Sequence, residues 1–319
     1  MADAARNADH DHEAGHGRGH GHSHAHDLPG NGRAFAIGVT LNLGFVVVEL
    51  VYGLVANSLA LLADAGHNFG DVLGLLLAWG AATLATRSPS RKFTYGLRGT
   101  TILAALGNAM LLLLAVGAVA WEAIRRMSEP AAVEGGVVIW VALTGVVVNT
   151  ATAVLFMRDR KKDLNIRGAY LHMAADAAVS LAVVVAGIAM LYTGWLWLDP
   201  VVSLAISVVI LLGTWGLLRE SVGLALHAVP EGVDAEAVHR FLAELPGVSE
   251  VHDLHIWGMS TTDTALTAHL VMPGGHPGDD FLADAAQALE QRFAIGHATV
   301  QIETATAAAP CALAPAHVV

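Results

Sequence analysis

The sequence predicts an α-helical membrane protein in which six transmembrane helices precede a small ferredoxin-like α+β domain. Of the 319 residues, 55% are hydrophobic and only 14% are charged. The chain contains six apolar runs, each long enough to cross about 30 Å of hydrocarbon as a helix. After Arg219 the composition becomes that of an ordinary soluble domain. A chain this apolar belongs in lipid, with a smaller part in water.

Composition divides the chain into four segments, with boundaries at 1–30, 31–222, 223–305 and 306–319. The first is rich in His, Gly and Asp and is expected to be disordered. His-rich tracts bind metals loosely. A purification tag is the alternative, but the irregular spacing favours a native metal-gathering tail. The last segment is rich in Ala and Pro and is also expected to be disordered.

The apolar runs lie near 33–56, 58–86, 100–126, 136–157, 167–193 and 199–222. Basic residues gather in two of the intervening loops, 87–99 and 158–166. Cytoplasmic loops carry an excess of Lys and Arg, so both termini are expected in the cytoplasm, with Arg125 and Arg126 as exceptions. No basic-then-apolar leader is present, and no cleavable signal peptide is expected.

The segment after Arg219 alternates between helical and strand patterns. Helical spacing covers 233–245 and 281–293, whereas 248–257, 265–272 and 298–303 have the pattern of strands. The order α-β-β-α-β is typical of a small ferredoxin-like domain.

Two apolar runs contain the same polar pair, His67 with Asp71 and His172 with Asp176. Residues four apart lie on one face of a helix, so each run presents an imidazole beside a carboxylate. Ionisable groups within a membrane are costly and indicate function. Two neutral imidazoles and two carboxylates balance a divalent cation, and four N/O ligands suit tetrahedral Zn²⁺. One pair alone could instead brace two helices or relay protons.

Other classes of protein fit the composition poorly. The net charge is −11 and the basic residues are sparse, which argues against nucleic-acid binding. The single cysteine, Cys311, allows neither an internal disulfide nor a Cys-based zinc knuckle. No Walker A motif is present, so ATP is not expected to drive the protein.

Several motifs together resemble the cation diffusion facilitator family of zinc exporters. They are Val48-Glu49-Leu50-Val51, Asn57-Ser58 followed by the run from Leu59 to His67, Asp71, Tyr95-Gly96, the His172/Asp176 pair, Asp199-Pro200, and Val251-His252-Asp253-Leu254-His255-Ile256-Trp257. The resemblance covers roughly 33–303. It departs after Tyr95-Gly96, where Thr100 and Thr101 replace the usual acid. A second metal site at that loop is therefore not expected.

The resemblance implies that His67, Asp71, His172 and Asp176 form the transport site, with His67 favouring zinc over cadmium. Asp64 would be an accessory acid near the cavity mouth. The C-terminal domain would resemble a metallochaperone and bind regulatory Zn²⁺ through His252, His269 and Glu303, with His255 and His297 as accessory residues. The family also implies a homodimer in a bacterial inner membrane.

The resulting hypothesis is a secondary transporter, not an enzyme, that exports Zn²⁺ or other divalent cations in exchange for protons by alternating access. Metal ligands must be deprotonated, so metal and protons compete for one site. Two alternatives remain. One is a membrane zinc sensor or buffer without transport. The other is an intramembrane metalloenzyme, which would need an open coordination position that four protein ligands do not leave.

Overall fold

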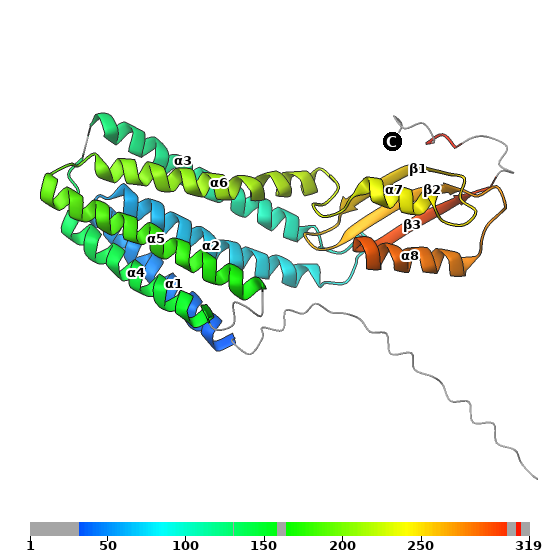
Figure 1. The fold of residues 1–319 in the computed structure, drawn as a ribbon, viewed down its shortest axis with the longest axis horizontal. Coiled ribbons are helices and arrows are strands. Elements are labelled where there is room, and N and C mark those ends of the chain that lie inside the picture. Colours follow the sequence, from blue (N-terminus) through cyan, green and yellow to red (C-terminus); the bar gives the residue numbers. More distant parts are fainter. Residues whose placement is uncertain (1–31, 130, 158–163, 305–310, 314–319) are drawn as a thin grey trace, which may run out of the picture.

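A computed structural model describes residues 32–129, 131–157, 164–304 and 311–313. Six long helices form a bundle, and a small domain with a three-stranded sheet is attached at one end (Figure 1). The His-rich tail, part of the basic loop at 158–166 and most of the C-terminal tail lie outside the described residues.

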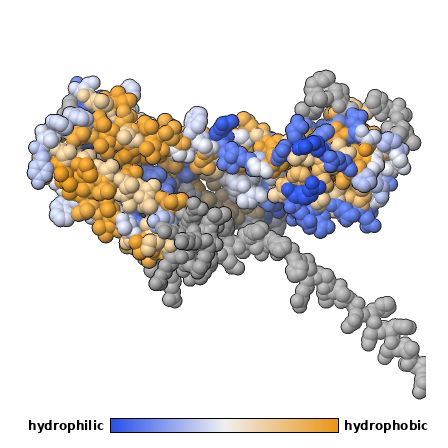
Figure 2. All heavy atoms as spheres, viewed as in Figure 1, coloured by the Kyte–Doolittle hydropathy of each residue, from blue (hydrophilic) through white to orange (hydrophobic). Residues whose placement is uncertain are grey.

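The bundle consists of α1 (Gly32–Val55), α2 (Leu59–Ala85), α3 (Thr100–Ser128), α4 (Gly135–Met157), α5 (Leu164–Thr193) and α6 (Leu198–Ala225). In the described ranges, α2 to α6 each contain a stretch long and apolar enough to cross a membrane, and α1 adds a shorter apolar stretch, Thr40–Val55. On the face shown in Figure 2, apolar residues predominate over the bundle, whereas hydrophilic residues concentrate on the attached domain. The chain is an integral membrane protein, as predicted.

The helices pack unevenly. α4 packs mainly on α5, and α3 packs on α6 and α2, whereas α5 only touches α2. Close packing of α2 on α3 depends on small residues: a Cβ at Gly70 would lie 2.0 Å from Leu112 Cδ2, and one at Gly74 would lie 2.7 Å from Asn108 Nδ2. A seam therefore runs between α2 and the α4–α5 pair.

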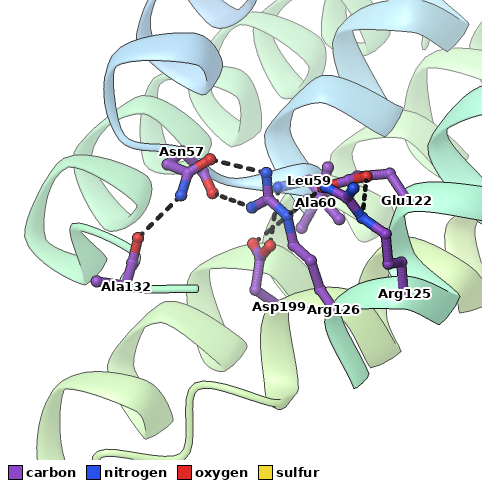
Figure 3. A network of polar contacts seen from close by, with 8 residues as sticks. All are labelled: Asn57, Leu59, Ala60, Glu122, Arg125, Arg126, Ala132 and Asp199. Carbon is purple, nitrogen blue, oxygen red and sulfur yellow. Dashed lines mark hydrogen bonds and ion pairs between the residues drawn. The ribbon is translucent and has the colours of Figure 1, made fainter. Parts of the chain in front are cut away.

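A polar network joins the helices around the start of α2 (Figure 3), at the end of the bundle farthest from the attached domain (Figure 1). Asp199 of α6 is buried and accepts hydrogen bonds from Leu59 N at 2.8 Å, from Ala60 N at 3.3 Å and from the Ser58 hydroxyl. The first N–H groups of a helix lack internal partners and carry partial positive charge, so a carboxylate there stabilises α2.

Arg126 of α3 completes this network. Its guanidinium donates to the backbone oxygen and to Oδ1 of Asn57, each at 2.7 Å, and pairs with Glu122 at 3.0 Å (Figure 3). Asn57 Nδ2 donates in turn to Ala132 O at 3.2 Å. Arg125 and Arg126, the exceptions to the charge pattern, are thus both paired, since Arg125 also bonds Glu122.

The attached domain contains α7 (Ala235–Ala243), β1 (Glu250–Gly258), β2 (Thr264–Val271), α8 (Asp279–Phe293) and β3 (Ile295–Glu303). This confirms the predicted α-β-β-α-β order. β1 pairs antiparallel with β2, and β2 pairs parallel with β3 through the α8 crossover. Apolar side chains of both helices and all three strands form its core, among them Val238, Leu242, Leu266, Leu270 and Leu289.

The two parts of the protein meet at the start of α3. Arg98 pairs with Asp263 at 3.2 Å, and Thr261 N donates to Thr101 Oγ1 at 3.0 Å. The ring of Tyr95 lies edge-on to His297, with centroids 5.6 Å apart. The first turn of α3, which contains Thr101, therefore contacts the C-terminal domain.

Candidate metal centres

The four residues predicted for a membrane site face one another across the seam between α2 and α5. His67 Nε2 lies 3.8 Å from Asp71 Oδ2 and 3.5 Å from Asp176 Oδ1. His172 Nε2 lies 3.1 Å from Asp71 Oδ2 and 3.6 Å from Asp176 Oδ2. Each carboxylate thus lies between both imidazoles, and the four side chains alternate around a ring.

These separations fit one metal ion. Tetrahedral Zn²⁺ holds N and O ligands at about 2.0–2.2 Å, which places ligand atoms about 3.3–3.6 Å apart. His67, His172 and Asp176 offer ligand atoms that all lie within 4.8 Å of one another, and Asp71 falls outside that mutual group. Asp176 Oδ2 and His67 Nδ1 are buried without a hydrogen-bond partner among the described residues. Asp71 would have to move toward these three residues to complete a four-ligand site.

Exposure of the site increases toward the C-terminal domain. Along α2 the exposed fraction of the side chain is 23% for His67 and 29% for Asp71; along α5 it is 2% for Asp176 and 40% for His172. α2 runs toward the C-terminal domain and α5 runs away from it (Figure 1). These four side chains are therefore most exposed on the side on which that domain lies.

Asp64 does not lie at a cavity mouth, and that part of the sequence prediction is wrong. Its side chain is 0% exposed and accepts a hydrogen bond from Ser180 Oγ at 3.1 Å. One turn of α2 places it behind His67, on the side away from the exposed ligands. Among the described residues, Asp64 does not belong to the group formed by His67, His172 and Asp176.

A second cluster lies on one face of the sheet in the C-terminal domain. His252 and His269 are register partners on β1 and β2, and their rings are 5.2 Å apart. Glu303, at the end of β3, places Oε1 3.3 Å from His252 Nε2 and 2.9 Å from His269 Nδ1. The three residues predicted from the sequence are thus brought together.

Cys311 is a member of this cluster that sequence reasoning missed. Its Sγ lies 3.5 Å from His269 Nδ1, and ligand atoms of His252, His269, Glu303 and Cys311 all lie within 4.8 Å of one another. His252 Nδ1 is buried and lacks a hydrogen-bond partner among the described residues. Two imidazoles, a carboxylate and a thiol are a donor set that suits Zn²⁺. The only signal in the sequence was that this cysteine is unique.

Electrostatics at this cluster reflect the closeness of its members. Burial raises the pKa of Glu303, but hydrogen bonding by Cys311 and the nearby His252 and His269 lower it, and the pKa lies below its ordinary value. A backbone hydrogen bond from Leu313 lowers the pKa of the Cys311 thiol, yet Glu303 and Asp253 raise it above the ordinary value. A metal ion bound here would replace the thiol proton.

A β-bulge between His252 and His255 brings Asp253 to this cluster. Asp253 adopts a positive φ of 49°, and its two carboxylate oxygens reach His255 Nε2 at 2.9 Å and His269 Nε2 at 3.4 Å. A carboxylate on the far nitrogen of a metal-binding His fixes the ring orientation. Within the described residues, His255 contacts the cluster through Asp253, and His297 lies at the domain junction instead.

Comparison with known proteins places this architecture in a family. Residues 35–224, more than half of the chain, match the family model described as the cation efflux transmembrane domain. Residues 230–305 match that of the cation efflux protein cytoplasmic domain. The chain belongs to the cation diffusion facilitator family. Cation diffusion facilitators are transporters, so the chain is not an enzyme.

Curated cation diffusion facilitators resemble this chain over most of its length. The metal cation efflux system protein CzcD of Cupriavidus metallidurans is 35% identical over 288 residues, which is 90% of each chain. The zinc transporter ZitB of Escherichia coli is 36% identical, covering 84% of this chain and 86% of ZitB. The cadmium, cobalt and zinc/H(+)-K(+) antiporter of Bacillus subtilis is 33% identical, covering 86% and 89%.

Among solved structures, the metal-bound C-terminal domain of the CzcD transporter is 36% identical to this cation diffusion facilitator. It covers 22% of this chain and 99% of that domain, with a TM-score of 0.21.

Proposed function

We propose that this protein exports Zn²⁺ from the cytoplasm in exchange for protons, and that His67, Asp71, His172 and Asp176 hold the transported ion. One observation carries the proposal: two imidazoles and two carboxylates alternate around a ring with N···O separations of 3.1–3.8 Å, inside a membrane bundle. The relatives named as zinc transporters or antiporters support zinc as cargo and protons as counter-ion.

Competition for the ligands couples the two ions. A free imidazole titrates at about pH 6.5, close to the range over which the pH of the cytoplasm and the pH of the exterior differ. A metal-bound imidazole must be neutral. On the cytoplasmic side, the deprotonated ligands take the metal ion. On the more acidic side, protons displace it. The exposure of His172 and Asp71 toward the C-terminal domain supports an inward-facing arrangement, with both termini in the cytoplasm of a bacterium and the bundle in its inner membrane.

The α2–α5 seam supports alternating access. α4 and α5 pack on each other far more than α5 packs on α2, so the pair can move as a unit against α2. Such a movement separates His172 and Asp176 from His67 and Asp71, which exposes the ion position to one side or the other. Transport then needs no large change within the α4–α5 pair or within α2.

Zinc flux in proteoliposomes tests this proposal. We expect vesicles loaded with a zinc indicator to take up Zn²⁺ when the lumen is more acidic than the medium, and uptake to collapse when an ionophore removes the pH difference. Uptake that ignores the pH difference would contradict exchange with protons. Binding of Zn²⁺ without any flux would instead favour the alternative of a membrane zinc sensor or buffer. Repeating the assay with Cd²⁺ and Co²⁺ defines the selectivity.

We further propose that the C-terminal cluster holds a regulatory Zn²⁺ and that two copies of the chain form a homodimer through these domains. His252, His269, Glu303 and Cys311 would hold the ion, and Asp253 would orient His269. Exposed acidic residues of this domain repel between copies, and a bound cation offsets part of that charge. They include Glu231, Asp234, Glu236, Glu244 and Glu250.

Cys311→Ser should weaken zinc binding at the C-terminal cluster about 10-fold or more, because a hydroxyl replaces a thiolate ligand. Co²⁺ bound to the full chain should lose its sulfur-to-metal absorption in the near ultraviolet, while transport at saturating zinc continues. Ala312→Ser, at an exposed neighbouring position, is the matched control. An unchanged Co²⁺ spectrum would mean that Cys311 is not a ligand.

A further inference from the structure

A second pair of ionisable groups lies within the bundle, separate from the four residues of the proposed transport site. Glu49 of α1 and Asp64 of α2 are both 0% exposed. Both lie where α1 packs on α2, and Asn68, four residues after Asp64 on α2, bonds to Glu49. Asn68 Nδ2 donates to Glu49 Oε2 at 3.4 Å, and Ser180 Oγ donates to Asp64 Oδ2 at 3.1 Å. Three helices, α1, α2 and α5, therefore contribute to one buried polar group.

This group is not satisfied by its own hydrogen bonds. Glu49 Oε1, Asp64 Oδ1 and Asn68 Oδ1 are all buried acceptors without a hydrogen-bond partner among the described residues. Two carboxylates cannot bond to each other, since neither donates; one proton between them turns the repulsion into a hydrogen bond. One proton shared by the two carboxyl groups would satisfy one of these acceptors.

No Lys or Arg in the described part of the chain interacts with the pair to neutralise it. The charged groups that face it are His67 on α2 and Asp176 on α5, and both belong to the proposed transport site. α4, which packs on α1, has no titratable residue between Gly135 and Met157. Two buried carboxylates repel each other and lose the stabilisation of water, so one shared proton stabilises the pair.

We propose that Glu49 and Asp64 form a second proton-binding site, which adds one proton to those exchanged at the metal ligands. The pair shares one proton when the metal position is empty. A divalent ion among His67, Asp71, His172 and Asp176 adds positive charge one helical turn away, and this drives the shared proton off to water. Conversely, proton uptake by the pair weakens metal binding, because coupling between two sites is reciprocal.

The position of the pair suits this role. Asp64 precedes His67 by about one turn of α2, toward the end of the bundle where Ser58 and Asp199 lie. A proton entering from that end reaches the pair before it reaches the metal ligands. The proton carrier and the cargo site thus lie in series along the bundle axis, with the cargo ligands nearer the C-terminal domain.

The inference rests on the proposed exchange of metal for protons, and the test separates the two. Glu49→Gln and Asp64→Asn mimic the protonated carboxyl groups, so both variants should fold and bind Zn²⁺. Proton release per Zn²⁺ bound, from calorimetry of the detergent-solubilised full chain in buffers of different ionisation enthalpy, should fall by about one in each variant. In proteoliposomes, the pH difference should change the rate of zinc uptake at least 10-fold less in each variant than in the unmodified protein. Zinc–zinc exchange should persist.

Glu134→Gln, an exposed carboxyl in the same bundle, is the control and should behave as the unmodified protein. Unchanged proton release and an unchanged response to pH in both Glu49→Gln and Asp64→Asn would overturn the inference. The inference would also be overturned if the variants kept the pH response but lost a dependence of zinc transport on K⁺. The Glu49–Asp64 pair would then hold a monovalent cation. If the unmodified protein showed no pH response, the proposed exchange itself would fail.

Discussion

Asp71→Asn should abolish zinc transport while the protein still inserts and folds. The substitution keeps the size of the side chain but removes the charge that lies between His67 and His172. An amide is a poor ligand for Zn²⁺, and the remaining carboxylate of Asp176 leaves the ion with an uncompensated positive charge inside the membrane. We expect at least about a 100-fold loss of transport rate, more than second-shell substitutions typically produce.

Zinc uptake into proteoliposomes and calorimetric zinc binding measure this effect together. Asp284→Asn, an exposed position on α8, is the matched control and should leave both quantities unchanged. The melting temperature in detergent should not fall for Asp71→Asn, because the side chain of Asp71 is 29% exposed. Transport at the normal rate would show that Asp71 is not a ligand of the cargo.

Asp199→Ala should destabilise the bundle by about 3 kcal/mol or more. Asp199 is fully buried and accepts from Leu59 N, Ala60 N and the Ser58 hydroxyl. Removing the acceptor leaves these donors without a partner at the start of α2, and each unsatisfied buried donor costs about 1–3 kcal/mol. The loss of the anion at a helix N-terminus adds to this cost.

Thermal unfolding of the detergent-solubilised protein measures the change. Asp199→Asn keeps one acceptor oxygen and should fall between the unmodified protein and Asp199→Ala. Asp279→Ala, in the first turn of the exposed helix α8, is a control for the loss of a first-turn acid and should change stability little. Equal stability of all three variants would mean that the carboxylate does not hold α2 in place.

The sequence predicts the main elements because their signals are local. Apolar length marks the helices of the bundle, and residues four apart on one face mark His67/Asp71 and His172/Asp176 as pairs. Alternation and helical spacing mark the C-terminal elements, although β3 begins at Ile295, three residues before the predicted strand. These patterns depend only on residues close in the chain.

What the sequence could not predict depends on contacts between distant segments. The burial of Asp64 results from Glu49 on another helix and Ser180 on a third. Cys311 reaches His269 from the far end of the chain, and a β-bulge with a positive φ turns Asp253 toward it. Neither a tail contact nor a bulge has a period that a sequence pattern would reveal.

The polar network around Asn57 also determines which end of α4 and α5 would move most in a rocking movement. Asn57 bonds Arg126 and Ala132, and Glu134 N donates to Ala56 O at 3.2 Å, so the start of α4 is tethered at this end of the bundle. His172 lies about 32 Å along α5 from Thr193, at the tethered end. A rotation of about 10° around the tether moves His172 by about 5 Å, whereas a metal shell tolerates about 0.2 Å. A small rotation about the tethered end would then be enough to break the coordination of the cargo ion.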